Sequence, residues 1–285
     1  MTVSFGRWMA IAALAAAPAA GAAQSVRVAE AAPGVLVLTT RAGNSVASVG
    51  PDGAVVAGVQ SPATTAAIEA ELARRTRSPR RYVVLAPGDS VFVAGDAGWG
   101  ALGATVAAHE WTRPRLQRWI GGAAGVALPP VTYSEVLAFD LNGESIHVVH
   151  MPPGYSDDDA IIHFHHANIV HLGSALTTDG YPHVDLAQNG SIDGIIETVR
   201  RFLDSPADSR FVPRRGAVIR TAELREYHRM LTAIRDGVRA LAGAGAPEDS
   251  VVAARPTAAF DARWGGGLIT AEQFVRMVYR SKPPA

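Results

Sequence analysis

Histidine and aspartate side chains gather between residues 157 and 185, and these residue types can bind a metal ion or move a proton. Three consecutive aspartates open the stretch, and five histidines follow: His163, His165, His166, His171 and His183. His163 and His165 would share one face of a strand, because strand side chains alternate. Imidazole together with carboxylate is a common ligand set for transition metals. The candidate metal or proton-transfer site consists of Asp157, His163, His165, His183 and Asp185.

The pattern around these histidines also fits a β-hairpin without a ligand role. Residues 160–165 and 168–172 alternate or run apolar on either side of a polar turn, as a half-buried strand followed by a deeper one does. A turn-rich run and then a helical pattern after Ser191 follow, and loops that leave buried strands often carry function. We interpret most of the histidines as sheet or core residues. A relocated metal site, or a metal-free site built on His183 and Asp185, is the alternative.

The elements before this stretch are mainly strands. A meander is predicted from Val35, with a turn at residues 51–53, and Ser61 followed by proline predicts the start of a helix. Residues 136–151 predict two further strands joined by an Asn-Gly turn.

The C-terminal region is predicted to be helical. Apolar residues recur every three or four positions from Leu224 to Leu241, with Thr221 as the predicted N-cap. Thr270 and Gln273 have the spacing of a capping box before a second amphipathic segment.

The composition indicates a globular protein and excludes several kinds of function. The chain has 285 residues, of which 48% are hydrophobic, and it carries 26 basic and 26 acidic residues. With no net charge and no run of one sign, we expect no nucleic-acid partner. The absence of cysteine excludes disulfides, thiolate catalysis and cysteine-ligated metals.

The first residues have the pattern of a bacterial secretory signal peptide. Arg7 precedes an apolar run over residues 8–17, and the small residues near Ala22 fit a cleavage site. The run is shorter than the roughly 20 residues that span a bilayer. We expect residues 1–23 to be removed on export to the periplasm or beyond, and no integral membrane segment to remain in residues 24–285.

Three short motifs stand close together in the second half of the chain: Ala-Asn-Ile-Val-His-Leu-Gly-Ser at 167–174, Tyr-Pro-His-Val-Asp-Leu at 181–186 and Gly-Ser-Ile-Asp-Gly at 190–194. They resemble the A-N-V-x-H-x-G-D, Y-P-x-x-D-L and G-S-I-D-G motifs of metallo-β-lactamase-fold hydrolases. The resemblance extends from about Val35 to Tyr279. It implies an α/β fold, the αβ/βα four-layer sandwich, with two mixed β-sheets and helices on both outer faces. It also implies one domain over residues 24–285, with a helical C-terminal region.

The same resemblance predicts that the main zinc-ligand motif is degenerate. The family supplies most of its ligands from a T-H-x-H-x-D-H run after a strand. Aligned with that run, the corresponding residues of this chain are Pro87, Asp89, Val91 and Phe92. Proline, valine and phenylalanine have no atom that binds Zn²⁺. We therefore expect no metal and no other cofactor, although the family would use zinc.

Three further ligand positions of the family also differ. Tyr155 and Arg215 stand where the family has histidine, and Ser174 stands where it has aspartate. The side chains expected to line one degenerate cleft are Asp89, Tyr155, Ser174 and Arg215. Because a guanidinium can neutralise carboxylates where zinc once did, we expect Arg215 or Arg214 to pair with Asp89 or with the aspartates at 157–159.

The functional interpretation is an exported protein of the metallo-β-lactamase fold that has lost its zinc ligands and serves as a non-catalytic binding or accessory protein. Its small-molecule or protein partner is not identified by the sequence. The alternative is a metallo-hydrolase-like enzyme that acts on an ester, amide or thioester through a rebuilt site.

Overall fold

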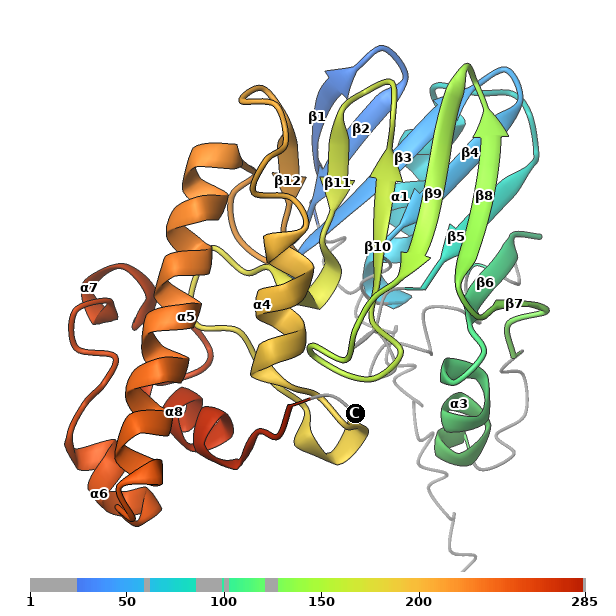
Figure 1. Cartoon of the computed structure of the whole chain (residues 1–285). Coiled ribbons are helices and arrows are strands. Elements are labelled where there is room, and N and C mark those ends of the chain that lie inside the picture. Colours follow the sequence, from blue (N-terminus) through green and yellow to red (C-terminus); the bar gives the residue numbers. More distant parts are fainter. Residues whose placement is uncertain (1–24, 59–61, 86–98, 100–102, 121–127, 284–285) are drawn as a thin grey trace, which may run out of the picture.

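Two β-sheets packed face to face, with helices outside them, form the fold (Figure 1). The computed structural model describes residues 25–58, 62–85, 99, 103–120 and 128–283. The N-terminal sheet has its strands in chain order: β1 (Arg27–Ala32), β2 (Val35–Thr39), β3 (Asn44–Gly50), β4 (Gly53–Ala57), β5 (Arg81–Val84), β6 (Thr105–His109) and β7 (Val131–Tyr133). Pairing is antiparallel from β1 to β4 and parallel from β4 to β7, so the sheet is mixed.

The C-terminal sheet has the order β13-β12-β11-β10-β9-β8. Its strands are β8 (Val136–Leu141), β9 (Glu144–His150), β10 (Ala160–Phe164), β11 (Ile169–His171), β12 (Arg210–Val212) and β13 (Ile219–Arg220). Only the β11–β12 pair is parallel, and the other pairs are antiparallel. The predicted hairpins at 136–151 and 160–172 are confirmed as β8–β9 and β10–β11.

Helices lie on the outer face of each sheet and leave part of the C-terminal sheet, at β8 to β10, uncovered (Figure 1). Those of the first half are α1 (Pro62–Ala73) and α3 (Thr112–Ile120). Those of the second half are α4 (Ile192–Arg200), α5 (Thr221–Gly243), α6 (Glu248–Ala253), α7 (Asp261–Trp264) and α8 (Ala271–Arg280). Two short 3₁₀ turns, η2 (Gly173–Ala175) and η3 (Leu186–Gln188), follow β11. This arrangement confirms the predicted four-layer sandwich. In the described ranges, no helix is long and apolar enough to cross a membrane.

The alternation of strand side chains builds the layers. In β2, Val35 and Val37 face the other sheet, where they pack in one cluster with residues of β9, β10 and β11. Leu36 and Leu38 face outward and pack in a cluster with Ile68 of α1 and other residues of the helical layer. Each fully buried leucine or isoleucine of this kind contributes roughly 1.5–3 kcal/mol. The N-terminal sheet is therefore hydrophobic on both faces because both are covered.

The outer layer of the C-terminal sheet depends on α4 and α5. Ile161, Val170 and Phe211 point outward from three neighbouring strands and pack in one cluster with apolar residues of these helices and of α8. Ser191 caps α4, since its Oγ accepts a hydrogen bond from the N–H of Asp193 at 3.3 Å. The predicted helix after Ser191 is confirmed.

Two helix starts test the predicted caps. The capping box of α8 is confirmed, because Thr270 Oγ1 accepts from Gln273 N at 3.1 Å and Thr270 N donates to Gln273 Oε1 at 2.9 Å. The predicted N-cap at Thr221 is wrong by one residue, since the helix α5 already includes Thr221 and Arg220 is its N-cap. The hydroxyl of Thr221 is used elsewhere, as it donates to Pro206 O at 2.6 Å.

The short strands β12 and β13 were not predicted from the sequence, and neither were β1 and β7. The meander expected from Val35 begins one strand earlier, at β1, whose mostly exposed side chains lack a strong apolar alternation. The strand β7 has only three residues and follows a Gly/Pro-rich stretch. Both are edge strands, which depend on pairing with a neighbour more than on their own sequence. The expected signal peptide, residues 1–23, lies outside the described residues.

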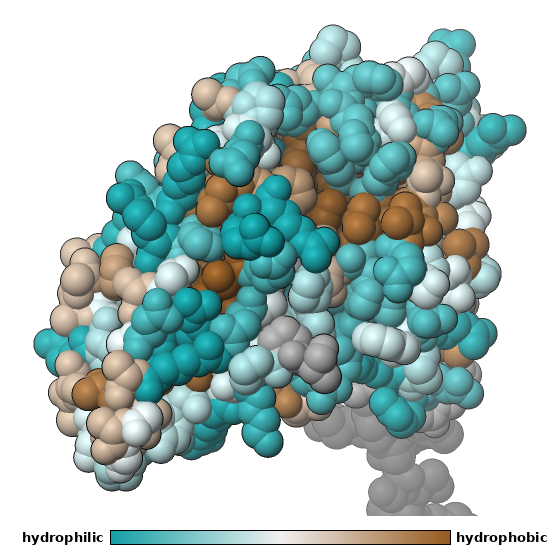
Figure 2. All heavy atoms as spheres, viewed as in Figure 1, coloured by the Kyte–Doolittle hydropathy of each residue, from teal (hydrophilic) through white to brown (hydrophobic). Residues whose placement is uncertain are grey.

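The uncovered part of the C-terminal sheet is visible in Figure 2, where a line of hydrophobic side chains crosses the region of β8 to β10 on an otherwise mostly hydrophilic surface. The strand register places Val136 beside Val149, and Val149 beside Ile161. Val136, at the edge, is 55% exposed.

Candidate functional site

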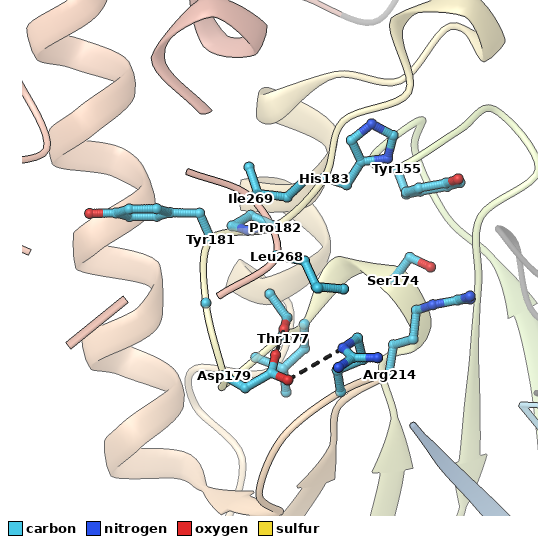
Figure 3. Close-up of a pocket in the computed structure, with 13 residues that line it drawn as sticks. Tyr155, Ser174, Thr177, Asp179, Tyr181, Pro182, His183, Arg214, Leu268 and Ile269 are labelled. Carbon is cyan, nitrogen blue, oxygen red and sulfur yellow. Dashed lines mark hydrogen bonds and ion pairs between the residues drawn. The ribbon is translucent and has the colours of Figure 1, made fainter. Parts of the chain in front are cut away.

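A cavity of about 320 Å³ opens at one edge of the C-terminal sheet (Figure 3). We call it the pocket, and its lining residues are Tyr155, Ser174, Leu176, Thr177, Asp179, Gly180, Tyr181, Pro182, His183, Arg214, Arg215, Leu268 and Ile269. These residues come from the loop before β10, the segment after β11, the loop after β12 and the segment before α8. Four separate parts of the second half of the chain thus meet in the pocket.

Sheet topology brings three of these parts to the same edge. The strands β11 and β12 are parallel neighbours, so η2 with Ser174 and the loop with Arg214 and Arg215 leave the sheet side by side. Because β10 is antiparallel to β11, the loop that enters β10 lies at this edge too, and it carries Tyr155.

Tyr155 is fixed through its backbone. Its N–H donates to Asp159 Oδ2 at 2.7 Å, and its carbonyl accepts from Asp185 N at 2.9 Å. Asp159 is buried, and burial raises the pKa of its carboxyl to about 7 despite hydrogen bonds from Tyr155 N and Ser156. The phenol ring lies 5.3 Å from the ring of His183, measured between centroids, so these two side chains form one wall of the pocket.

The loop after β12 that carries Arg214 and Arg215, which we call the arginine loop, is held by hydrogen bonds from both halves of the fold. The N–H of Arg214 donates to Gly173 O and Leu176 O, both at 3.0 Å, which ties the loop to η2. From the N-terminal sheet, Asn44 N donates to Arg214 O at 2.9 Å, and Asn44 Nδ2 donates to Pro213 O at 3.0 Å and to a further carbonyl of the loop, at residue 216, at 2.9 Å. Asn44 itself does not line the pocket.

Arg215 forms an ion pair within the pocket. Its Nε lies 3.3 Å from Asp179 Oδ2, and its Nη1 lies 3.4 Å from the carbonyls of Arg41 and Ala42. The dashed line of Figure 3 ends at Asp179. Arg215 thus does not pair with the aspartates at 157–159, of which Asp157 and Asp158 contact Arg115 instead. The other expected partner, Asp89, lies outside the described residues.

Burial favours the uncharged form of two titratable side chains in the pocket wall, Tyr155 and His183. Desolvation, with a smaller effect of Asp185 and against the effect of Arg214, raises the pKa of Tyr155 to about 12. Desolvation also lowers the pKa of His183, against Asp185 and together with Arg214. The other charged residue types in the described lining are Arg214, Arg215 and Asp179.

The residues predicted for a degenerate site are placed as follows. Tyr155, Ser174 and Arg215 line the pocket together. The other four predicted positions, Pro87, Asp89, Val91 and Phe92, lie outside the described residues. The structure therefore brings together every described member of the predicted set.

The structure divides the alternative histidine and aspartate cluster among three surroundings. His163 and His165 have ring centroids 3.9 Å apart on the outer face of the C-terminal sheet, where His165 also meets His147. Asp157 is paired with Arg115, and His183 lies in the pocket wall. Within the described ranges, no group of three or more histidine, aspartate or glutamate side chains is arranged to hold a metal ion.

The predicted metal-free pair of His183 and Asp185 is not oriented for proton transfer. Asp185 Oδ1 accepts from Ala187 N at 3.1 Å, and Oδ2 accepts from Gln188 Nε2 at 2.5 Å, as the cap of η3. The carboxylate thus caps the turn η3. Among the hydrogen bonds of the described residues, none joins Asp185 to His183.

Sequence reasoning missed the residues that complete the pocket. Asp179 lies in the turn-rich run at 177–182, which gave a general signal for function but not for a partner of Arg215. Leu268 and Ile269 come from a segment nearly 90 positions away in the sequence, and only the folded chain shows that they belong to this pocket.

No protein-family model matches the sequence, and no curated protein is similar to it in sequence. Solved structures do match. A metallo-β-lactamase from Pontibacter korlensis is 14% identical with a TM-score of 0.58, and the match covers 73% of this chain and 99% of that one. DIM-1 metallo-β-lactamase is 13% identical with a TM-score of 0.59, over 73% and 97%. TMB-1 is 14% identical with a TM-score of 0.57, again over 73% and 97%. At these identities the likeness concerns the fold and not the residues of the pocket.

Proposed function

We propose that this chain, which has the metallo-β-lactamase fold, is an exported, non-catalytic protein that binds a small molecule in the pocket. One observation carries the proposal. Tyr155, Ser174 and Arg215, which the sequence resemblance equates with three zinc-ligand positions, line a single cavity. This supports a pocket at the family's metal position whose side chains serve another task.

These side chains do not fit a zinc ion. Zn²⁺ takes imidazole nitrogen, carboxylate oxygen or thiolate. A guanidinium such as that of Arg215 is always charged and repels a dication, and a phenol with a pKa of about 12, as in Tyr155, resists the ionisation that a metal ligand needs. The aligned positions Pro87, Val91 and Phe92 have no donor atoms at all. No catalytic step through zinc is therefore derived for this chain.

The size and lining of the pocket support binding of a small molecule. A cavity of about 320 Å³ falls at the lower end of the roughly 300–1,000 Å³ typical of ligand pockets. Such pockets combine apolar walls with a few fixed polar groups. Leu176 and Tyr181 are buried apolar wall residues, while Ser174 and the arginines supply polar groups.

Export is supported by the N-terminal sequence. Arg7, the apolar residues 8–17 and the small residues near Ala22 form the pattern of a cleavable signal. The absence of cysteine is compatible with an oxidising compartment. We place the mature protein, from about residue 24, in the periplasm or outside the cell.

A hydrolase with a rebuilt site is the second candidate. The observation that favours it is the imidazole of His183 in the pocket wall, because histidine is the commonest general base and burial lowers the pKa of this one. Against it, Asp185 is engaged in the cap of η3 and does not orient that imidazole. The binding function therefore has the stronger support.

The decisive experiment uses the mature protein, residues 24–285, purified without chelator. We expect little bound zinc by elemental analysis and background rates with nitrocefin and p-nitrophenyl esters. In a thermal-shift screen, we expect a ligand that raises Tm equally with and without EDTA and is recovered unchanged. Stoichiometric zinc with chelator-sensitive turnover would overturn the proposal. Consumption of the ligand by the metal-free protein, abolished by His183→Gln, would establish the second candidate instead.

A further inference from the structure

Two histidines on the outer face of the C-terminal sheet share a hydrogen bond. Nε2 of His165 lies 3.1 Å from Nδ1 of His147, and the two ring centroids are 4.4 Å apart. The strand register explains this contact. His147 of β9 is paired with His163 of β10, and His165 lies two residues further along on the same face. Diagonal neighbours across two strands are within reach of long side chains. We call His147 and His165 the histidine pair.

The backbone on both sides of the histidine pair is fixed. His147 lies in a central strand, because β9 is paired with both β8 and β10. The N–H of His165 donates to Ser145 O at 3.0 Å, which extends the pairing with β9 by one residue beyond β10. The turn that follows is held by Glu144, whose carboxylate accepts from the N–H of His166 at 2.7 Å. Secondary structure therefore sets the spacing of the pair, while the exposed imidazole of His165 can still rotate.

The ring nitrogens of the histidine pair are bonded only to each other within the described ranges. A second pair, His109 and His150, shows the contrast, although its rings are stacked at 4.1 Å. There, Nε2 of His109 lies 2.8 Å from Ser134 O. Nε2 of His150 lies 2.9 Å from Asp157 O. Those imidazoles hold loop backbone, whereas the nitrogens of the histidine pair are available to a ligand.

The distance between the two nitrogens suits two ligands of one metal ion. Imidazole nitrogens bind zinc at about 2.0 Å, so two such ligands are roughly 2.8 Å apart at right angles and about 3.3 Å apart in a tetrahedron. The distance of 3.1 Å in the histidine pair lies between these values. At least one imidazole is uncharged, since one nitrogen must accept the hydrogen bond. Rotation of the rings would turn their lone pairs from the shared proton to a metal ion.

A site with two imidazoles favours Cu²⁺ over other divalent ions. Affinity for nitrogen ligands increases from Mn²⁺ to Cu²⁺ and falls again at Zn²⁺, and Cu²⁺ accepts a tetragonal set of nitrogen and oxygen ligands. Structural zinc sites almost always have four protein ligands. Among the described residues, no third histidine, aspartate or glutamate completes a metal-binding group here. His163 stacks on His165, with ring centroids 3.9 Å apart, and is therefore a positioning residue.

We propose that His147 and His165 bind one Cu²⁺ ion on the outer face of the C-terminal sheet, with water in the remaining coordination positions. Helices leave this part of the sheet uncovered, so an ion can reach it from solvent (Figure 1). Neither histidine is among the described lining residues of the pocket. The copper site is thus separate from the pocket and does not rest on the proposed binding function.

The test is a calorimetric titration of the mature protein, residues 24–285, with Cu²⁺ at neutral pH. The protein carries no affinity tag and is first freed of metal with EDTA, and glycine in the buffer keeps the ion soluble. We expect one Cu²⁺ per chain and at least tenfold weaker binding of Zn²⁺. Pulsed EPR should show the remote nitrogen of coordinated imidazole, which glycine cannot supply.

Variants locate the copper site. His147→Gln and His165→Gln should each weaken Cu²⁺ binding at least tenfold and remove or reduce the imidazole signal. His166→Gln is the matched control, because it removes the adjacent histidine, whose side chain is 69% exposed, and it should keep the affinity. His163→Phe retains a ring against His165 and should also keep the affinity. The Tm of each variant in EDTA checks that it is folded.

Three results would overturn the copper site. The first is no binding at micromolar free Cu²⁺, or binding that neither His147→Gln nor His165→Gln weakens. The second is an equal loss in His166→Gln, which would show adventitious binding to exposed histidines. The third is a loss in His163→Phe as large as that in His165→Gln, which would replace the two-ligand site with a different set. None of these results would change the proposal for the pocket.

Discussion

Asp179 Oδ2 lies 3.3 Å from Nε of Arg215, and this ion pair joins the segment after β11 to the loop after β12. The backbones of the same two segments are also hydrogen-bonded, from Thr178 N to Arg215 O at 3.0 Å. The side chains of Arg215 and Asp179 are 32% and 42% exposed, so the pair is in contact with water. Because the pair is exposed, we expect its removal to change the lining of the pocket with only a small loss in the free energy of unfolding.

Arg215→Ala should destabilise the fold only slightly. Solvent-exposed ion pairs contribute about 0.2–1 kcal/mol, because water and salt screen them. We expect a loss within that range in urea unfolding, and a similar loss for Asp179→Asn. A loss of about 3–5 kcal/mol, typical of a broken buried pair, would contradict the exposed position of this one.

Arg215→His should not restore zinc binding. The substitution places one imidazole at a ligand position of the family, but Pro87, Val91 and Phe92 still offer no donor atoms. We expect no stoichiometric zinc after dialysis against the metal, measured by elemental analysis. Tight binding of one zinc ion by this single variant would show that the remaining residues provide a ligand set after all.

Gly194→Ala should disturb the pocket by displacing the loop that carries Tyr155. A Cβ at this position of α4 would lie 1.6 Å from Pro153 O, in the loop that carries Tyr155. We expect a destabilisation of about 1–3 kcal/mol from overpacking, together with weaker ligand binding. Gly243→Ala is the control, because no atom lies within 4 Å of its Cβ, and it should be neutral or stabilising. Equal behaviour of the two variants would contradict the close packing at Gly194.

The stability of the protein should depend on pH through His163. Burial, with smaller effects of His165 and His147, lowers the pKa of His163 in the folded state to about 4, whereas an unfolded histidine titrates near 6.5. Between these values the unfolded state binds more protons, so this residue makes the fold less stable as pH falls from about 6.5 to 4.

The comparison with His163→Gln isolates this effect from other groups. Asp159 acts in the opposite direction, because its raised pKa of about 7 costs stability as pH rises towards 7. The difference in unfolding free energy between wild type and His163→Gln should therefore shift against the wild type as pH falls from 6.5 to 4. A difference that stays constant over this pH range would contradict the buried position of His163.

Glu144 should matter for the β10–β11 hairpin. Its buried carboxylate accepts from His166 N at 2.7 Å and from Ala167 N at 3.0 Å, so it satisfies both donors of the turn. Glu144→Ala should cost about 2–4 kcal/mol, since hydrogen bonds to a charged group are worth about 1.5–3 kcal/mol each and are not fully additive. Glu144→Gln should cost less. A neutral Glu144→Ala variant in urea unfolding would contradict this role.

Much of the fold could be predicted from the sequence because its strands and helices carry local signals. The hairpin at residues 160–172 and the capping box at Thr270 depend on neighbouring residues, and both were predicted at the right places. The pocket could be predicted only in part. Tyr155, Ser174 and Arg215 were found through a resemblance in motif order, whereas the Arg215–Asp179 pair and the rim at Leu268 depend on contacts between segments far apart. Such contacts leave no periodic pattern in a single sequence.

The position of Asn44 has a consequence for how the two halves of the chain assemble. This residue of β3 gives the arginine loop three hydrogen bonds, although its own side chain is absent from the pocket wall. The halves meet at Ser134, between β7 and β8, where a cut would leave each with its own sheet. The C-terminal fragment would then hold every lining residue that the structure describes but lack Asn44, which helps to position the loop of Arg214 and Arg215. The two fragments would have to reassociate to restore the pocket. A ligand that binds in the pocket would then stabilise the complex of the two fragments.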